Sequence, residues 1–383
     1  MKTYKIITLG ASGSGKTVFL ASMFRALGIQ ADHGFYLHVK NPRQQRLLNA
    51  IYTEIIAGDI WPKGTRYSEI SEWTYICRVK NPDDLKYYDA CEFVYFDYAG
   101  GRLTDMNEED TELQDIIKKS DALLGLIDGK KIQALMTNDN QSDIDSFLNK
   151  DLPNIIQWMS DCQVPIHFVI SKWDLLEKTF SLKQIRDRLI EIPEFQMLVH
   201  KRNLANSPVR LIPVSSVGSN FANLESDGSM KKIPGAIPKP FQVEVPISCV
   251  FPDGMKAQLG ELLQKREQLE NQKQKIVQQN PLLQFMQTAG SFVVDVLLEQ
   301  MLDQYLPGEL KIAKPLLNKL DDLLFSQARI KNKENLDKLR AERDSSLKIV
   351  TDDATALTHA IDSFLYIQDK LELDFPESEL ILQ

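Results

Sequence analysis

The chain has 383 residues, which is too long for one small domain and predicts two or three. Hydrophobic residues make up 43% of it and charged residues 26%, a globular composition that excludes a disordered or fibrous protein. The formal net charge of -8 argues against a protein whose main role is to coat nucleic acid. The four cysteines are far apart and lack metal-ligand spacing, so we expect buried thiols in a reducing compartment and a cytoplasmic protein.

Short apolar runs alternate with helical patterns over the first two-thirds of the chain. This predicts an α/β domain, a mostly parallel sheet with helices on both faces. A strand is expected at 4–9 and a helix at 16–27, and a second helix at 42–57 has Asn41 as its cap and Gly58 at its end. Six residues of the second helix are expected to form one apolar face: Leu47, Leu48, Ile51, Tyr52, Ile55 and Ile56. Further strands are expected at 73–79, 91–97, 122–128, 165–171 and 209–214.

The pattern changes after the last of these strands. Residues 225–240 are rich in Ser, Gly, Lys and Pro and predict a loop, while 242–251 fits either a last strand or a packed extended segment. From Met255 onward, helical patterns predict an all-α region whose leucines fit a bundle core better than a coiled-coil surface. We therefore expect an α/β domain at 1–253 and a helical bundle or interaction domain at 254–383. An apolar patch at 292–298 would suit a membrane interface, but it lacks a Lys/Arg face, so we expect core burial and no membrane contact.

Residues 10–17 read Gly-Ala-Ser-Gly-Ser-Gly-Lys-Thr and match the pattern G-x-x-x-x-G-K-[ST]. Glycines let successive backbone N–H groups point at phosphate oxygens, and the helix that follows presents its positive end. Lys16 supplies a charge at the outer phosphates, and Thr17 supplies a hydroxyl for Mg²⁺. A strand before the loop and a helix after it fit this interpretation. The stretch predicts a nucleoside triphosphate site with contacts from Ser12, Gly13, Ser14, Gly15, Lys16, Thr17 and Val18.

Two later strands end in residues suited to the same ligand. The strand at 91–97 ends in Asp97, which can hold Mg²⁺ beside the phosphate loop, and the N–H of Gly100 can meet the terminal phosphate. The strand at 165–171 runs into Lys172 and Asp174. This carboxylate can accept hydrogen bonds from the N1–H and the exocyclic amine of guanine, while the Lys172 stem covers the base. Adenine lacks this donor pair, so GTP is favoured over ATP.

The turn after the last strand holds Ser215 and Ser216, whose backbone N–H groups can meet the guanine oxygen. These four elements, in this order over 1–253, resemble the Ras-like small GTPase domain of the translation-factor-related P-loop class. The resemblance implies that Lys16 and Gly100 act on the terminal phosphate, that Thr17 and Asp97 bind Mg²⁺, and that Lys172, Asp174, Ser215 and Ser216 hold guanine.

The same family has a loop threonine that caps Mg²⁺ and the terminal phosphate, and Thr65 is our candidate for it. The Trp-Pro pair at 61–62 and the Asp-Tyr-Ala-Gly-Gly stretch at 97–101 also look like the double-GTPase-like domains of bacterial conflict and signalling systems.

The sequence departs from the family at three points. Ser171 stands where Asn or Thr usually precedes the lysine; its hydroxyl can keep a tie to the phosphate loop, with weaker guanine affinity. Gly101 replaces the glutamine that orients the attacking water, so hydrolysis should be slow. Arg102 is close enough to assist as an arginine finger, although a surface role is favoured. The long interval between Thr17 and Asp97 has room for the extra helix at 42–57 and the strand at 73–79.

The sequence thus predicts a GTP-dependent switch that binds GTP and Mg²⁺ and hydrolyses GTP slowly to GDP and phosphate. Its helical region would bind a protein partner or a second copy. The alternative is a non-hydrolysing scaffold stabilised by nucleotide, which Gly101 keeps open. A third reading is an ATP-driven P-loop motor, against which Lys172 and Asp174 argue.

Overall fold

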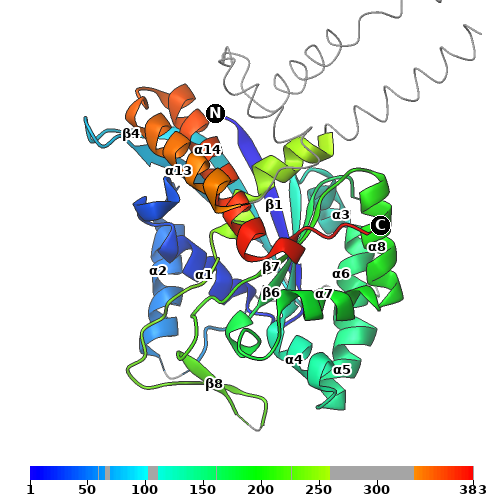
Figure 1. Cartoon of the computed structure of the whole chain (residues 1–383). Coiled ribbons are helices and arrows are strands. Elements are labelled where there is room, and N and C mark those ends of the chain that lie inside the picture. Colours follow the sequence, from blue (N-terminus) through cyan, green and yellow to red (C-terminus); the bar gives the residue numbers. More distant parts are fainter. Residues whose placement is uncertain are drawn as a thin grey trace, which may run out of the picture.

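A computed structural model describes residues 1–58, 60–64, 70–101, 111–160, 162–225, 227–258 and 332–382. Its centre is a seven-stranded sheet in the order β2-β3-β4-β1-β5-β6-β7 (Figure 1). The strands β4, β1, β5, β6 and β7 are parallel, and β2 and β3 pair antiparallel at one edge. The predicted α/β class with a mostly parallel sheet is confirmed. The strand bounds are β1 (Thr3–Gly10), β2 (Tyr36–Val39), β3 (Ile70–Lys80), β4 (Tyr87–Tyr98), β5 (Ala122–Asp128), β6 (Ile166–Ser171) and β7 (Val209–Pro213).

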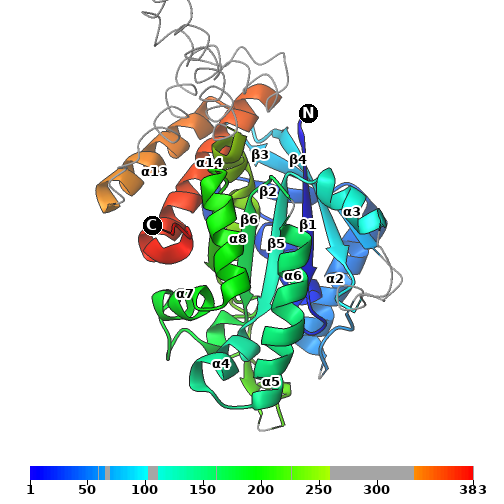
Figure 2. The ribbon, with the colours of Figure 1, turned by 90° about the vertical axis from the view of Figure 1, so that its right-hand side faces the viewer.

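Helices cover both faces of this sheet. Because successive side chains of a strand point to opposite sides, Ile6 and Ile7 of β1 enter two different cores. The first core also takes residues of α1 (Lys16–Ala26) and α14 (Asp353–Asp374). The second core lies under a further set of helices, of which Figure 2 shows α6 and α8 in front of the sheet. They are α3 (Thr111–Lys118), α4 (Gly129–Thr137), α5 (Gln141–Ser146), α6 (Leu152–Met159), α7 (Leu182–Ile190) and α8 (Pro193–Leu204).

The helix α2 (Pro42–Ala57) begins and ends where the sequence predicts. The Asn41 side chain accepts a hydrogen bond from the Arg43 N–H, and Gly58 follows the last turn. The expected apolar face is wrong in part, because Leu48 and Ile55 are buried but Leu47 is 52% exposed. This helix packs mainly on α1 and makes fewer contacts with the sheet, so a narrower stripe is enough to bury it.

Residues 242–251 are neither the strand nor the extended segment expected from the sequence. They contain α9 (Val245–Ser248), and helix resumes over 250–258. Pro246 lies in the first turn of α9, where its missing N–H costs nothing, and Gln242 before the helix has a left-handed φ of 55°. Residues 245–251 are all buried, which explains why the apolar pattern of the segment resembles that of a strand.

The described part of the predicted helical region packs against the α/β domain. It comprises residues 254–258, α13 (Lys333–Lys348) and α14, which begins with a capping box between Asp352 and Thr355. The Phe364 ring of α14 lies 5.0 Å from that of Phe35 and 6.0 Å from that of Phe93 on β4. Residues 353–374 therefore share the first core with the sheet. The patch at 292–298 and the other helices expected between 259 and 331 lie outside the described residues.

The segment after α14 continues along the edge of the sheet; we refer to residues 375–382 as the C-terminal strap. The Leu380 N–H donates to the Val209 carbonyl at 2.9 Å, and Glu379 forms an antiparallel bridge with Arg210 of β7. Asn203 of α8 exchanges hydrogen bonds with the backbone of Leu380 and Leu382 at 2.9 and 2.8 Å. The strap thus runs past β7 towards α8 (Figure 1).

A buried polar cluster joins the strap end of α14 to the sheet. Asp253 accepts hydrogen bonds from Arg210 Nη2 at 2.7 Å and Gln368 Nε2 at 2.8 Å, and its other oxygen lies 2.9 Å from His167 Nε2. Glu372 of α14 lies 2.8 Å from Arg210 Nη1. All five side chains are buried, so each charge is stabilised by a partner instead of water.

Among the described helices, none is both long and apolar enough to span a membrane.

Candidate functional site

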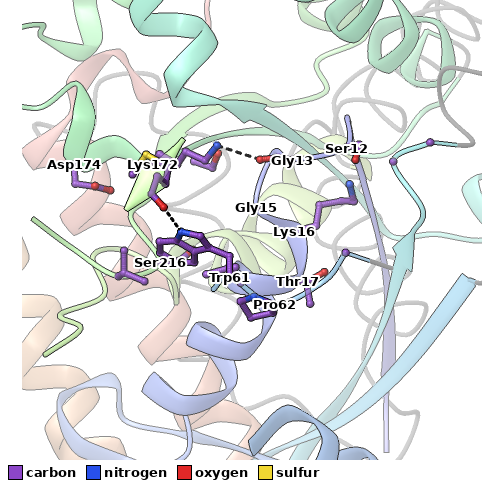
Figure 3. A pocket seen from close by; sticks show the side chains of 17 residues that line it. Ser12, Gly13, Gly15, Lys16, Thr17, Trp61, Pro62, Lys172, Asp174 and Ser216 are labelled. Carbon is purple, nitrogen blue, oxygen red and sulfur yellow. Dashed lines mark hydrogen bonds between the residues drawn. The ribbon is translucent and has the colours of Figure 1, made fainter. Parts of the chain in front are cut away.

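A cavity of about 460 Å³ opens at the carboxyl ends of β1, β4 and β6, the edge at which open α/β sheets bind ligands. Figure 3 shows the side chains that point into it. Ten of the predicted site residues line this cavity: Ser12, Gly13, Gly15, Lys16, Thr17, Val18, Gly100, Lys172, Asp174 and Ser216. The fold therefore brings together residues that are up to about two hundred positions apart in the chain.

The loop at 10–17 connects β1 to α1 as the motif predicts. Gly13 and Gly15 have φ angles of 83° and 91°, which side-chain-bearing residues rarely adopt, and α1 starts at Lys16. Lys16 Nζ donates to the carbonyls of Gly10 and Ala11 at 2.6 and 3.1 Å. Burial lowers the pKa of Lys16, while the charge of Asp97 opposes that shift. A buried ammonium whose acceptors, within the described part of the chain, are two neutral carbonyls is well placed to take an anionic ligand.

The turn after β4 lies directly against this loop. A Cβ on Gly100 would come within 2.5 Å of Ser12 N and 2.7 Å of Gly10 O, so no other residue fits without moving the loop. Asp97 at the end of β4 is 2% exposed, and its charge acts on Lys16. The carboxylate thus lies near Lys16, behind the residues that line the cavity. Thr65 and Arg102 lie outside the described residues.

Lys172 ties the end of β6 to the loop at 10–17. Its backbone is left-handed, with φ 52°, and its Nζ donates to Gly13 O at 3.1 Å and to Asp128 Oδ2 at 2.8 Å. The hydroxyl of Ser171, which could have kept a tie of this kind, donates to Ile127 O on the neighbouring strand β5 at 3.1 Å. The tie to the loop is made by Lys172 in its place.

Asp174 lies at the other end of the cavity from Lys16 (Figure 3). Ser215 Oγ donates to Asp174 Oδ1, and the same hydroxyl accepts a hydrogen bond from the Gly218 N–H at 2.8 Å. Burial raises the pKa of Asp174, and the Ser215 hydrogen bond opposes that shift. Ser215 therefore orients the carboxylate from behind, while Ser216 reaches the cavity itself. The predicted residue Ser14 is buried within the loop.

The sequence analysis missed an aromatic wall. Trp61 and Pro62 line the cavity, and in Figure 3 the Trp61 ring lies between the side chains of Ser216 and Thr17. Trp61 Nε1 donates to Met230 O at 2.6 Å, and Lys232 Nζ lies 5.0 Å from the ring centroid. Three contacts of Lys232 fix the chain before Trp61, to the carbonyls of Glu54, Gly58 and Ile60 at 2.7, 2.8 and 2.9 Å.

The anchor of this wall is a hairpin of β8 (Ala222–Leu224) and β9 (Met230–Lys232). It falls partly in the stretch expected to be a loop. The Asp227-Gly228 pair between two short runs is a hairpin signal that could have indicated it. Asp128, which holds Lys172 and caps α4 through the Lys130 N–H, was also missed; its position at the end of a predicted strand was the available signal.

No protein-family model matches this chain, and a comparison with curated proteins gives no match either. The fold and the site therefore define a class of architecture. It is an α/β protein with a glycine-lysine loop at the end of its central strand and a cavity that runs from that loop to the half-buried carboxylate of Asp174.

Proposed function

We propose that this protein binds GTP and hydrolyses it slowly to GDP and phosphate, as a switch whose helical region contacts a protein partner. The observation that carries the proposal is the placement of Lys16 and Asp174 at opposite ends of one cavity. The cationic end suits the phosphates, and the carboxylate end suits a base with two adjacent N–H donors. Guanine has such a pair and adenine does not.

The phosphate end also suits Mg²⁺. The Thr17 hydroxyl and the Asp97 carboxylate are oxygen donors of the kind that Mg²⁺ prefers, and nucleotide phosphates would complete the ligand set. When bound, the ion would neutralise charge on the phosphates. Lys16 would bind the outer phosphates, and the backbone N–H of Gly100 would orient the terminal one.

Gly101 favours slow turnover. It lines the cavity where related enzymes carry a glutamine, and a glycine has no side chain with which to orient water. The same observation supports the second candidate, a scaffold that binds nucleotide without hydrolysing it. Phosphate release from the GTP complex distinguishes the two, because only the switch releases phosphate.

Asp174→Ala tests the guanine assignment. We expect the dissociation constant for GTP to rise about tenfold to a hundredfold, because two hydrogen bonds to a charged group are lost, and that for ATP to stay unchanged. Calorimetric titration with Mg²⁺ measures both. Glu177→Gln is the matched control, since this exposed carboxylate lies near Asp174 but does not line the cavity. A preference for ATP that Asp174→Ala leaves intact would contradict the proposal.

Trp61→Ala should weaken GDP binding by about tenfold, because stacking of a base or sugar on an aromatic ring is lost. GDP should also change the tryptophan fluorescence of the wild-type protein, and Trp61→Phe should remove that change. The chain has four tryptophans, and of these only Trp61 lines the described cavity. Trp158→Phe is the control, and it should leave the response in place. A response that persists in Trp61→Phe would place the ligand away from this wall.

A further inference from the structure

One aromatic side chain links the end of α14 to both loops at the Asp174 end of the cavity. The Phe375 ring lies 6.0 Å from the Trp173 ring and 6.3 Å from the Phe241 ring, at interplanar angles of 85° and 72°. Trp173 stands between Lys172 and Asp174. Phe241 pairs with Ser215 through two backbone hydrogen bonds of 2.8 and 3.1 Å. Phe375 thus packs behind both members of the Asp174–Ser215 hydrogen bond.

The position of Phe375 is fixed from both sides. Its N–H donates to Leu371 O at 2.7 Å at the end of α14, and its carbonyl accepts from the Ser378 N–H at 2.9 Å. Beyond it, the C-terminal strap is bound to β7 and α8 through Leu380 and Asn203. Before it, Gln368 and Glu372 connect α14 to the buried cluster on β7 and the helix at 250–258.

The opposite end of the cavity has a different support. The loop at 10–17 is held by β1, by α1 and by the Lys172–Gly13 hydrogen bond. A displacement of the strap would therefore disturb the Asp174 end first, because Trp173 and Phe241 would lose the ring that packs between them. Binding that depends on phosphate alone would change little.

We infer that Phe375 is a positioning residue for base recognition, and that the segment 353–382 sets the affinity of the site for the base. This inference rests on the proposed function and assigns its regulation: any event that moves the Phe375 ring away from Trp173 and Phe241 accelerates nucleotide release. The segment contributes no group to the cavity. It acts by holding the Asp174 carboxylate and the Ser215 hydroxyl in the relative positions that their hydrogen bond requires.

Phe375→Ala tests the inference with two ligands, GDP and inorganic pyrophosphate, both with Mg²⁺. We expect the dissociation constant for GDP to rise about tenfold, mainly through faster dissociation, and that for pyrophosphate to change less than about twofold. Leu380→Ala is the matched control. It removes a buried side chain, 1% exposed, from the same strap but leaves the Phe375 ring contacts, so GDP affinity should be retained despite a lower unfolding temperature.

Phe375→Leu serves as a milder variant should the alanine variant fail to fold, and it should weaken GDP binding in the same selective way. Equal loss of GDP and pyrophosphate binding in the Phe375 variants, or equal loss of GDP binding in Leu380→Ala, would overturn the inference. So would unchanged GDP binding in a folded Phe375 variant, which would leave the proposed function intact. Absence of GDP binding to the wild-type protein would instead overturn the proposed function and this inference together.

Discussion

Replacing Lys16 with methionine should weaken the binding of GTP, GDP and pyrophosphate by about a hundredfold or more, because one partner of a buried charge pair with phosphate is lost. Methionine keeps the length of the side chain but has no charge. Among the described residues, the hydrogen-bond partners of Lys16 are two backbone carbonyls, and burial lowers its pKa, so a phosphate group would gain strongly from this ammonium. Calorimetric titration of the three ligands checks the result.

Lys63→Met is the control for a general charge effect. Lys63 is exposed between Pro62 and Gly64, two residues that line the cavity, yet it does not line the cavity itself. Its replacement should change affinity by less than about threefold, as expected for a screened surface charge. If the two methionine variants lost affinity equally, long-range charge rather than a direct phosphate contact would explain the binding.

Asp253→Asn should lower the free energy of unfolding by about 3–5 kcal/mol, because it leaves the Arg210 charge buried beside a neutral amide. For a chain of this size that corresponds to a loss of about 5 °C in unfolding temperature. Differential scanning calorimetry measures both quantities. Asp187→Asn is the matched control: this aspartate also has a lowered pKa and arginine and lysine partners, but it lies on the surface, so we expect a change below about 0.5 kcal/mol.

The stability of the wild-type protein and that of Asp253→Asn should also depend differently on pH. Burial opposes ionisation of Asp253, but the Arg210 charge and the hydrogen bonds from His167 and Arg210 outweigh it and hold the pKa of the carboxyl well below its usual range. A lowered native pKa contributes stability that is full above the unfolded value of about 3.9 and is lost as the pH falls below it. The wild-type protein should therefore lose more stability between about pH 5 and pH 3 than Asp253→Asn does. Parallel acid profiles for the two proteins would contradict this assignment.

Sequence signals from residues close together in the chain predicted the loop at 10–17 and the ends of two strands that face the cavity. The loop at 10–17 needs only glycines, a lysine and a strand-to-helix context, and the structure has this context. The ends of β4 and β6 could be predicted because buried parallel strands have continuous apolar runs, which stop at Asp97 and Ser171. These signals depend on neighbours a few residues away.

The parts that the sequence analysis missed depend on distant neighbours. Trp61 becomes part of the cavity only through Met230 and Lys232, about 170 positions later. The Ser171 hydroxyl and the Lys172 ammonium both offered hydrogen-bond donors, and only their geometry decides that Lys172 reaches Gly13. Residues 242–251 look like a strand because burial on all sides removes the periodicity that distinguishes a helix.

The strap and α14 also have a consequence for how the chain acquires its structure. Gly34 accepts a hydrogen bond from His359, Asn81 donates one to Val350, and Val209 accepts one from Leu380. The first two contacts span 325 and 269 positions, so the entropy cost of closing these long loops must be overcome before the contacts can stabilise the folded state. During synthesis, the first core and the β7 edge stay open until residues 353–382 have left the ribosome, because the side chains that complete them are not yet available. We therefore expect the sheet to reach its native packing only after residues 353–382 have emerged, and the nascent form to depend on chaperones to shield the strands β3 and β7 until then.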